Sequence, residues 1–172
     1  MNLLKTTILT AACAGTANAW KSVGHLLVAR IAHDILETES PDTITKVESI
    51  LKPMQKDFPT WTTKEGNHPF VECTTYADDI KYKGGSFQSP WHFDDEPYLD
   101  EGGTIADFNY TIPPHNNTEA VDAIVNMFNK VSGYKDTYIY KSLISHGPSG
   151  HSDIDSISNA MRFLIHYVGD AH

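Results

Sequence analysis

The chain has 172 residues, of which 40% are hydrophobic and 20% are charged, and its 13 basic and 22 acidic side chains give a net charge of −9. This composition is typical of an ordinary soluble globular protein and excludes a disordered chain, because apolar residues recur throughout. The acidic balance argues against a nucleic-acid-binding module that depends on Lys and Arg to release counterions from phosphates.

The first nineteen residues combine an early Lys, a short apolar stretch and a small-x-small ending at residues 17–19. This pattern predicts a secretory signal peptide over residues 1–19, since the segment is too short to span a bilayer. The alternative is a buried N-terminal helix. Cleavage makes Trp20 the mature N-terminus, and no other stretch is apolar enough for a membrane span. Two Asn-x-Thr sequons, at Asn109 and Asn116, agree with secretion and glycosylation.

Apolar residues at helical spacing predict a first helix over Ser22 to Leu36. These residues are Val23, Leu26, Leu27, Ile31 and Ile35. A second helix opens at Ser40 and stops before Pro53, and a third helix includes Val71 to Lys81. Gly84 to Gly103 is predicted to be a loop, because it is rich in Gly, Pro and aromatic residues.

The second half of the chain carries clear capping signals. Asn117 is predicted to cap a fourth helix that ends near Gly133. Thr137 to Ile144 is compatible with a short helix or a strand. The last helix begins near Ser152, where Asp155 completes a partial capping box. Five helices without strand alternation predict an all-α domain.

The last helix contains the sharpest signal for chemistry. His166 and Asp170 lie four residues apart, so they project from one helix face and present an imidazole nitrogen and a carboxylate to one ion. Taken alone, a structural His–Asp hydrogen bond explains this pair better.

Further placements strengthen the case for a metal site. Asp78 and Asp79 stand at a predicted helix end, and His92 lies between two aromatic residues in the loop that follows. His25 lies on an otherwise apolar helix face. A lone His there is more often a core residue, and an Asp pair is more often surface. Four such placements in one chain favour a shared site.

In this order the residues resemble a known family, the secreted zinc-dependent single-strand-specific nucleases, or class I nucleases, of the fungal and plant type. The resemblance runs from Trp20 to His172 through four ordered motifs: WxxxGH, which begins at Trp20, then ADxI, WHF and HxxGD. The family shares its fold with bacterial zinc-dependent phospholipase C. The resemblance therefore implies an all-α, multi-helix fold of the phospholipase C and zinc nuclease type.

The resemblance implies a cluster of three zinc ions per full-length member, with ligands for two present in this chain. Trp20 would bind through its α-amino group and carbonyl oxygen. This amine exists only after signal cleavage, and its pKa of about 7.7 to 8.0 lets a metal displace the proton near neutrality. The donor mix suits zinc without excluding manganese or cobalt. The implied ligands are Asp78, His92 and His166 for one zinc, Asp170 as the bridging carboxylate, and His25 with Trp20 for the second.

The implied reaction is hydrolysis of single-stranded DNA and RNA to 5′-phosphate products, with removal of 3′-phosphate from mononucleotides as a further activity. Asp78 and Asp170 are the implied catalytic carboxylates. Lys81 stands where the family usually has a phosphate-contacting Arg, so we expect weaker transition-state stabilisation. Phe93 matches the aromatic on which the family stacks a base, and Asp95 matches the carboxylate that binds the base edge. Such stacking contributes about 1 to 3 kcal/mol per base; core packing is the alternative for Phe93.

Two other functions remain open, a zinc-dependent phospholipase C and a catalytically inactive remnant. A phospholipase C would not need a base-binding pair. We further expect a monomer in a secreted or lysosomal-type compartment, with nucleic acid and mononucleotides as substrates. Five histidines match no implied ligand and are expected on the surface or in loops: His33, His68, His115, His146 and His151.

The chain departs from the family pattern at its end. It stops at His172, where members continue into a large C-terminal half that supplies the ligands of the third zinc. We therefore expect residues 20–172 to be the N-terminal part of the nuclease domain, to fold poorly alone and to cleave weakly. Cys73, the single cysteine left after processing, would find a disulfide partner in that half.

Overall fold

The computed structural model describes residues 22–94, 102–103, 107, 114–147 and 152–171. Within these ranges all regular structure is helical, with seven α-helices, several short 3₁₀ helices and no strand. The predicted all-α class is confirmed. None of the helices described combines the length and the apolar composition needed to cross a membrane.

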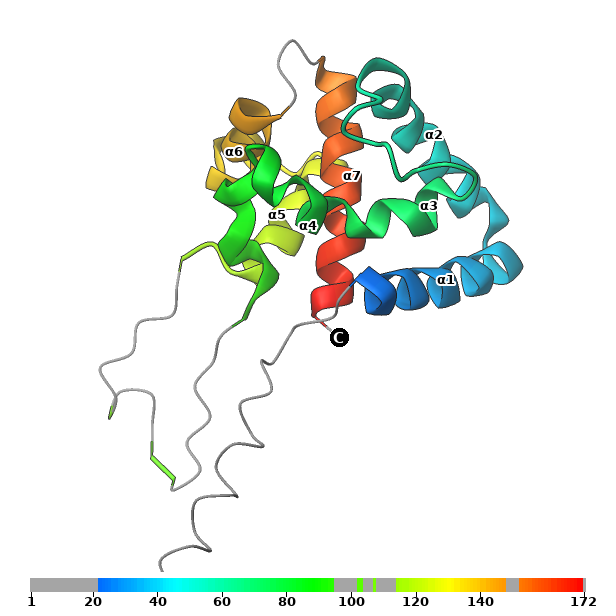
Figure 1. The fold of residues 1–172 in the computed structure, drawn as a ribbon. Coiled ribbons are helices and arrows are strands. Elements are labelled where there is room, and N and C mark those ends of the chain that lie inside the picture. The colour runs from blue at the N-terminus through cyan, green and yellow to red at the C-terminus, as the bar shows by residue number, and fades with distance from the viewer. Residues whose placement is uncertain (1–21, 95–101, 104–106, 108–113, 148–151, 172) are drawn as a thin grey trace, which may run out of the picture.

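The elements follow one another along the chain as Figure 1 shows. The α-helices are α1 (Ser22–Glu39), α2 (Pro41–Asp57), α3 (Pro69–Glu72), α4 (Tyr76–Ile80), α5 (Asn117–Phe128), α6 (Tyr138–His146) and α7 (Asp153–Asp170). The 3₁₀ helices are η1 (Cys73–Thr75), η2 (Lys81–Lys83), η3 (Gly85–His92) and η5 (Tyr134–Asp136).

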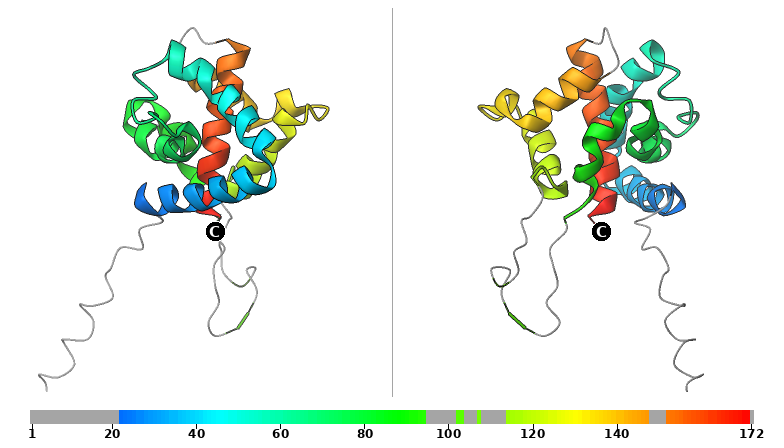
Figure 2. Two further views of the ribbon diagram at one scale, coloured as in Figure 1. Left: turned by 90° about the vertical axis from the view of Figure 1, so that its right-hand side faces the viewer. Right: turned by 60° about the vertical axis from the view of Figure 1, so that its left-hand side comes forward.

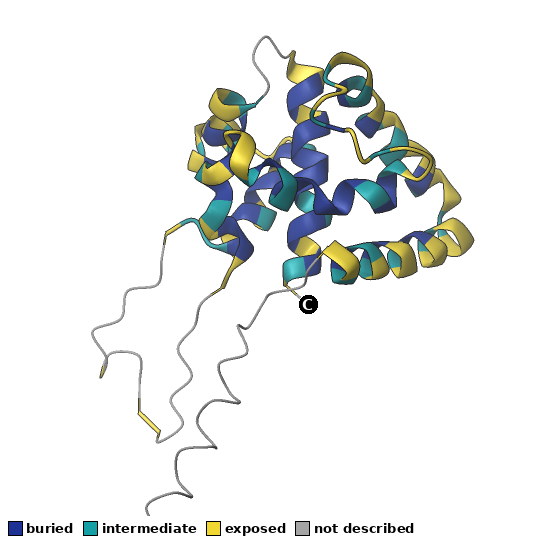
Figure 3. Cartoon of the chain, in the orientation of Figure 1, coloured by how far each residue is buried: buried dark blue, intermediate teal, exposed yellow. Residues whose placement is uncertain are grey.

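Helix α7 runs through the middle of the molecule, and α1, α2 and α5 pack against it from different sides (Figures 1 and 2). Its start is fixed by a full capping box, in which the Asp155 N–H donates to Ser152 Oγ and the Ser152 N–H donates to the Asp155 carboxylate. Because neighbours surround the helix, most of its length is buried (Figure 3). The HxxGD segment at its C-terminal end therefore lies inside the fold.

The largest apolar cluster joins α7 to the elements on one side of it. Trp91 of η3 meets Phe163 and Tyr167 of α7 edge-on, at ring-centroid distances of 6.0 and 6.1 Å. All three rings are fully buried. Aromatic pairs in this arrangement contribute beyond the area that they bury. They fix the end of η3 against α7, which places His92 opposite His166.

A buried ion pair joins α7 to α2 and to the loop after it. The Arg162 guanidinium donates to both carboxylate oxygens of Glu65, at 2.7 and 2.6 Å, and to the Leu51 carbonyl oxygen at 2.9 Å. Arg162 is fully buried, and burial raises the pKa of Glu65 even with Arg162 beside it. This pair tethers the loop between α2 and α3 to the centre of the molecule.

The prediction that the second helix stops before Pro53 is wrong. The helix continues through this proline to Asp57, and its next turn is closed where the Phe58 N–H donates to the Met54 carbonyl oxygen. Proline inside a helix removes one hydrogen bond. Here Leu51 and Met54 are fully buried on either side of it, so tertiary packing outweighs that loss.

The segment predicted as one helix from Val71 to Lys81 is broken into short pieces. It contains α3, η1, α4 and η2 in succession, and the left-handed Gly84, with φ of 93°, ends the run. The predicted loop from Gly84 to Gly103 is wrong over residues 85–92, which form η3. Gly85 makes this turn possible because a Cβ there would lie 2.6–2.9 Å from Ile80 atoms.

The fourth and fifth predicted helices also differ in detail. Asn116, and not Asn117, caps α5 by accepting the Glu119 N–H, and α5 ends at Phe128, earlier than predicted. Thr137 caps α6, which settles its segment as a helix. Asn116 thus belongs to a sequon and to a cap at once, while the Asn109 sequon lies outside the described residues.

Helix α1 buries a different face from the one that its apolar pattern suggests. His25, Ala29 and His33 are buried along it. The apolar residues Val23, Leu27, Ile31 and Ile35 are instead 50–77% exposed. Apolar side chains occur on two sides of this helix, so periodicity alone does not reveal which side faces the core.

Two further expectations concern single side chains. His33 is buried, which contradicts its expected place on the surface; His68 and His146 are exposed, and His151 lies outside the described residues.

Cys73 is buried between α2 and α7, and its thiol donates to the Phe70 carbonyl oxygen. Burial raises the pKa of this thiol well above its usual range, so it packs as an apolar side chain.

Candidate metal centre

Four elements bring polar side chains together at the C-terminal end of α7. They are Asp78 from α4, His92 from the end of η3, His166 and Asp170 from α7, and His25 from α1. Two overlapping groups have donor atoms within 4.8 Å of one another: Asp78 with His92 and His166, and His25 with His166 and Asp170. The sequence-predicted ligands among the described residues thus meet at one place.

The carboxylate of Asp170 stands in the middle of three imidazole rings. Its Oδ2 lies 2.8 Å from His92 Nδ1 and 3.1 Å from His166 Nε2. Its Oδ1 lies 3.2 Å from His25 Nε2. The Asp170 side chain is 3% exposed, so this carboxylate faces imidazole nitrogens and almost no water.

The hydrogen bond on the other side of His166 fixes its tautomer. His166 Nδ1 contacts the carbonyl oxygen of Thr74 in η1. A carbonyl oxygen only accepts, so Nδ1 carries a proton. The other ring nitrogen, Nε2, faces a carboxylate oxygen of Asp170 and the ring nitrogen of His92, at 3.1 Å in each case. Metal-bound histidines are oriented in this way by backbone carbonyls.

The donor spacing tests whether the cluster suits zinc. Donor atoms on a tetrahedral zinc, at bond lengths of about 2.1 Å, lie about 3.4 Å apart. The contacts between His25, His92, His166 and Asp170 measure 2.8–3.2 Å. The buried His25 Nδ1 and His92 Nε2 have no hydrogen-bond partner among the described residues. Three imidazoles and two carboxylates with this spacing form a donor set that fits zinc.

The ionisation states of the cluster also suit a metal. Burial alone would raise the pKa of Asp170, but hydrogen bonds from His166, His25 and His92 outweigh it and hold this pKa well below its usual range. Burial lowers the pKa of His92 despite the opposing Asp170 carboxylate. The ionised carboxylate and the neutral imidazole are the forms that bind metal.

Asp78 and Lys81 form the half-exposed edge of the cluster. Lys81 Nζ donates to Asp78 Oδ1 at 2.8 Å, one turn along the chain. Burial acts to raise the pKa of Asp78, but this hydrogen bond and the nearby His166 lower it overall. The Lys81 side chain is 28% exposed, so its ammonium group is within reach of a ligand from solvent.

A buried hydrogen-bond chain holds three of these elements in register. The Tyr167 hydroxyl donates to Gln88 Oε1, and Gln88 Nε2 donates to the Ala77 carbonyl oxygen at 2.8 Å. Asn117 Nδ2 donates to the Tyr167 carbonyl oxygen at 3.0 Å. Sequence reasoning missed Gln88, because a single glutamine in a Gly- and Pro-rich segment carries no pattern. The chain joins α4, η3, α5 and α7 directly behind the metal-binding side chains.

Phe93 lies at the mouth of the cluster. The residue is 44% exposed, and the centroid of its ring lies 6.0 Å from that of His92. The alternative of core packing for Phe93 is therefore wrong. Its backbone is fixed to α5, since its carbonyl oxygen accepts the Asn117 N–H and the next residue, Asp94, accepts from Thr118. The other two predicted site residues, Trp20 and Asp95, lie outside the described residues.

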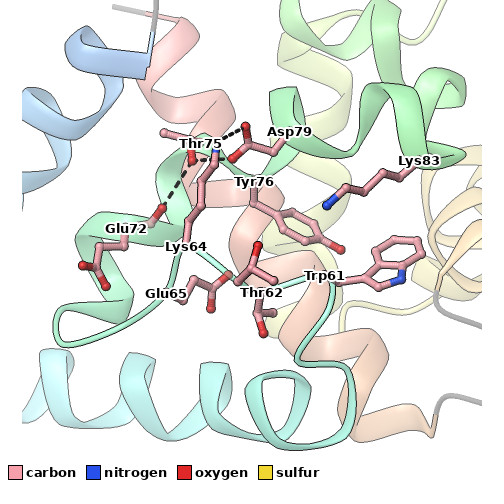
Figure 4. A pocket seen from close by; sticks show the side chains of 10 residues that line it. Trp61, Thr62, Lys64, Glu65, Glu72, Thr75, Tyr76, Asp79 and Lys83 are labelled. Carbon is pink, nitrogen blue, oxygen red and sulfur yellow. Dashed lines mark hydrogen bonds and ion pairs between the residues drawn. The ribbon is translucent and has the colours of Figure 1, made fainter.

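A separate polar pocket of about 240 Å³ lies beside α4 (Figure 4). Its lining includes Asp79, which follows Asp78 in the chain, Lys83 of η2, and Trp61 from the loop after α2. Asp79 is already paired with Lys64 and accepts from Thr75. No member of the metal cluster lines this pocket.

Three comparisons with known proteins give one match. The model of a single protein family, described as S1/P1 nuclease, matches residues 20–172. Neither the comparison with curated proteins nor the comparison with solved structures gives a match.

Proposed function

The chain belongs to the S1/P1 nuclease family, and from that premise we propose that it is a zinc-dependent endonuclease that hydrolyses single-stranded DNA and RNA to 5′-phosphate products. The observation that carries the proposal is the buried Asp170 carboxylate with imidazole nitrogens from three elements around it. An ordinary structural His–Asp pair needs one imidazole. Three rings converging on one carboxylate form a donor set that binds divalent metal.

Two zinc ions account for the donors. One would be held by Asp78, His92 and His166, and the Asp170 carboxylate would contribute to both ions. The second is assigned to His25 and to the α-amino group and carbonyl oxygen of Trp20, which requires removal of residues 1–19 in the secretory route. The two donor groups that share His166 support this division.

Bound there, zinc supplies Lewis-acid activation of the phosphodiester and of the attacking water. The chain's own residues hold the charges in place. Asp78 and Asp170 stay ionised, because their pKa values lie below the usual range. Lys81 offers an ammonium donor, at the exposed edge of the cluster, to phosphoryl oxygens as they gain negative charge. The acidic chain binds a polyanion through this local concentration of positive charge.

The single-strand preference is assigned to Phe93 and Asp95. An exposed aromatic ring beside the cluster offers a face on which an unpaired base stacks, and a duplex hides that face. Asp95 would accept hydrogen bonds from the base edge. Both contacts act on the base and leave phosphate binding to the cluster.

Replacing Phe93 tests this assignment. We expect Phe93→Ala to raise KM for single-stranded oligonucleotides about tenfold with little change in kcat, because base stacking contributes about 1 to 3 kcal/mol. Steady-state kinetics on a short labelled strand measures both constants. Tyr82→Ala is the matched control, since Tyr82 is an aromatic residue that is 99% exposed outside the cluster.

The decisive experiment compares metal content and hydrolysis in one preparation. The purified protein is loaded with zinc, analysed for bound metal, and incubated with equal amounts of single-stranded and duplex oligonucleotide. We expect cleavage of the single strand to 5′-phosphate ends, loss of cleavage after chelation and recovery with added zinc. Phosphatidylcholine serves as a parallel substrate, and its preferred hydrolysis would indicate a phospholipase C instead.

Asp170→Asn separates the metal centre from the rest of the fold. We expect this variant to lose zinc and activity together, whereas Asp122→Asn, at an exposed position on α5, keeps both. A zinc-loaded protein that cleaves neither substrate would show an inactive remnant. A protein that takes up no zinc would refute the proposed centre itself.

A further inference from the structure

A second group of metal-binding side chains lies on α1, apart from the centre. It consists of His33, Asp34 and Glu37, whose donor atoms all lie within 4.8 Å of one another. His25 and His33 share the buried face of α1 but lie two helical turns apart, about 12 Å along the axis. The two groups therefore cannot share an ion.

His33 is the residue that makes this group more than a pair of surface acids. It is 8% exposed, and its Nδ1 is buried without a hydrogen-bond partner among the described residues. The same nitrogen lies 3.5 Å from Asp34 Oδ1, which is longer than an ordinary N–H···O hydrogen bond. A buried imidazole nitrogen that lacks a partner is costly, and a cation between it and the carboxylate would remove that cost.

The positions on the helix suit one ion. His33 and Glu37 are four residues apart, so they project from the same face one turn from each other. The 3.5 Å between His33 Nδ1 and Asp34 Oδ1 already matches the spacing of about 3.4 Å between donors on a tetrahedral ion. Asp34 and Glu37 are exposed, so small rotations close the remaining separation.

The surroundings favour a transition metal over calcium or magnesium. An imidazole with two carboxylates suits zinc, cobalt or nickel, whereas the hard alkaline-earth ions prefer all-oxygen sites. His68, from the loop before α3, stands edge-on to His33 at a ring-centroid distance of 6.4 Å and brings a second imidazole near. Among the described residues, Arg30 is the cation in contact with this group, and its Nε lies 2.9 Å from Asp34 Oδ1 and 3.1 Å from Asp34 Oδ2. Both side chains of this pair are 52% exposed, so the pair contributes little and a metal ion at Oδ1 would compete with Arg30 at small cost.

We propose that His33, Asp34 and Glu37 form an independent site for one divalent transition-metal ion on α1. The site does not depend on the nuclease centre and takes no part in hydrolysis. It binds more weakly than the centre, because two of its three ligands are exposed.

Cobalt titration tests the proposal with a readout other than activity. The full chain carrying Asp170→Asn, which disables the centre, is stripped of metal and titrated with Co²⁺ by equilibrium dialysis and visible absorption. We expect one remaining binding site, and we expect added Glu37→Gln or His33→Asn to weaken it at least tenfold. Adding Glu39→Gln, an exposed acid on the last turn of the same helix, should change nothing.

The same substitutions in the parent chain complete the test. Glu37→Gln should leave hydrolysis of single-stranded DNA and the metal content of the centre unchanged. Identical cobalt isotherms for the parent, Glu37→Gln and His33→Asn in the Asp170→Asn background would overturn the site, because the remaining metal would then be bound elsewhere. That outcome would leave the proposed nuclease activity unaffected.

Discussion

The ammonium group of Lys81 contacts the carboxylate of Asp78 at the edge of the described metal cluster. These two side chains are 28% and 34% exposed, whereas the other side chains of the described cluster are buried. We expect Lys81→Ala to lower kcat about 100-fold, because it removes a donor to the charge that develops on the phosphoryl oxygens. Zinc content should stay close to that of the parent, since lysine is not a ligand. Steady-state kinetics with metal analysis measures both.

The neighbouring lysine supplies the control for this prediction. Lys83 belongs to the same short helix, η2, but lies outside the cluster. Lys83→Ala should therefore keep the parent kcat. Lys81→Arg should match or exceed the parent, because the guanidinium presents two donors in a fixed plane. Equal losses for both alanine variants would contradict a specific role for Lys81.

Gly169 makes room for a metal-binding ring. A Cβ at this position of α7 would lie 3.1 Å from His25 Nδ1, so alanine pushes the imidazole out of place. Alanine also favours a helix over glycine by about 1 kcal/mol. We expect Gly169→Ala to keep or raise the Tm of the metal-free protein while it weakens zinc binding about tenfold.

For Gly169→Ala, the Tm of the metal-free protein and the zinc affinity are not expected to fall together. Thermal unfolding without metal reports on the helix, and competition with a chromophoric chelator reports on zinc affinity. Val168→Ala, at the more exposed neighbouring position, should leave zinc affinity unchanged. A parallel fall in Tm and affinity for Gly169→Ala would mean that the fold, and not His25, is disturbed.

At the level of secondary structure elements, Gln88 connects the segments that carry the cluster. Gln88→Leu removes the two buried hydrogen bonds that Gln88 makes with the Ala77 carbonyl oxygen and the Tyr167 hydroxyl. Each unsatisfied group costs about 1–3 kcal/mol. We expect a lower free energy of unfolding and, in addition, weaker zinc binding, since α4 and η3 lose their common tether. Urea unfolding and chelator competition measure the two effects.

Gln88→Glu tests whether Gln88 acts on zinc binding by holding the metal-bearing elements in position. The carboxylate keeps the acceptor for Tyr167 but loses the donor to Ala77, so zinc affinity should fall less than in Gln88→Leu. Zinc affinity equal to that of the parent in Gln88→Leu would mean that the metal-bearing elements hold their positions without this hydrogen-bond chain.

The helices themselves were the part of the fold that local sequence could predict. The Ser152 cap acts within one turn, so it is visible in the sequence, whereas the segment that begins at Thr137 stayed undecided between a helix and a strand. Pro53 was misread because the burial of Leu51 and Met54 that offsets it is a tertiary effect. The 3₁₀ helix η3 was missed for the same reason, since contacts with α7 hold it.

The candidate site divides in a similar way. The spacing of His166 and Asp170 on one helix is a local pattern and could be predicted. The contact of His166 with the Thr74 carbonyl oxygen depends on where the chain returns, and backbone carbonyls leave no mark on the sequence. The buried His33 was missed because α1 is apolar on two sides.

For the whole molecule, the Arg162–Glu65 ion pair is buried and joins α7 to the loop between α2 and α3. Arg162→Met leaves the Glu65 carboxylate buried without its partner, and we expect a loss of about 3–5 kcal/mol in the free energy of unfolding. Urea denaturation at neutral pH measures it. Arg30→Met is the control, because its pair with Asp34 is exposed and worth less than about 1 kcal/mol.

The double variant completes that prediction. Glu65→Gln added to Arg162→Met removes the uncompensated charge and should restore part of the lost stability. A loss below about 1 kcal/mol for Arg162→Met alone would mean that solvent reaches the pair, contrary to its burial. The loop between α2 and α3 should then also be more open to proteolysis than the structure implies.

The ligands of the proposed centre come from both the first and the last helix of the described chain, α1 and α7. A growing polypeptide would therefore lack the proposed centre even after His25, Asp78 and His92 have emerged, because His166 and Asp170 follow them in the sequence. The proposed hydrolysis could begin only once α7 has been synthesised and has packed between its neighbours.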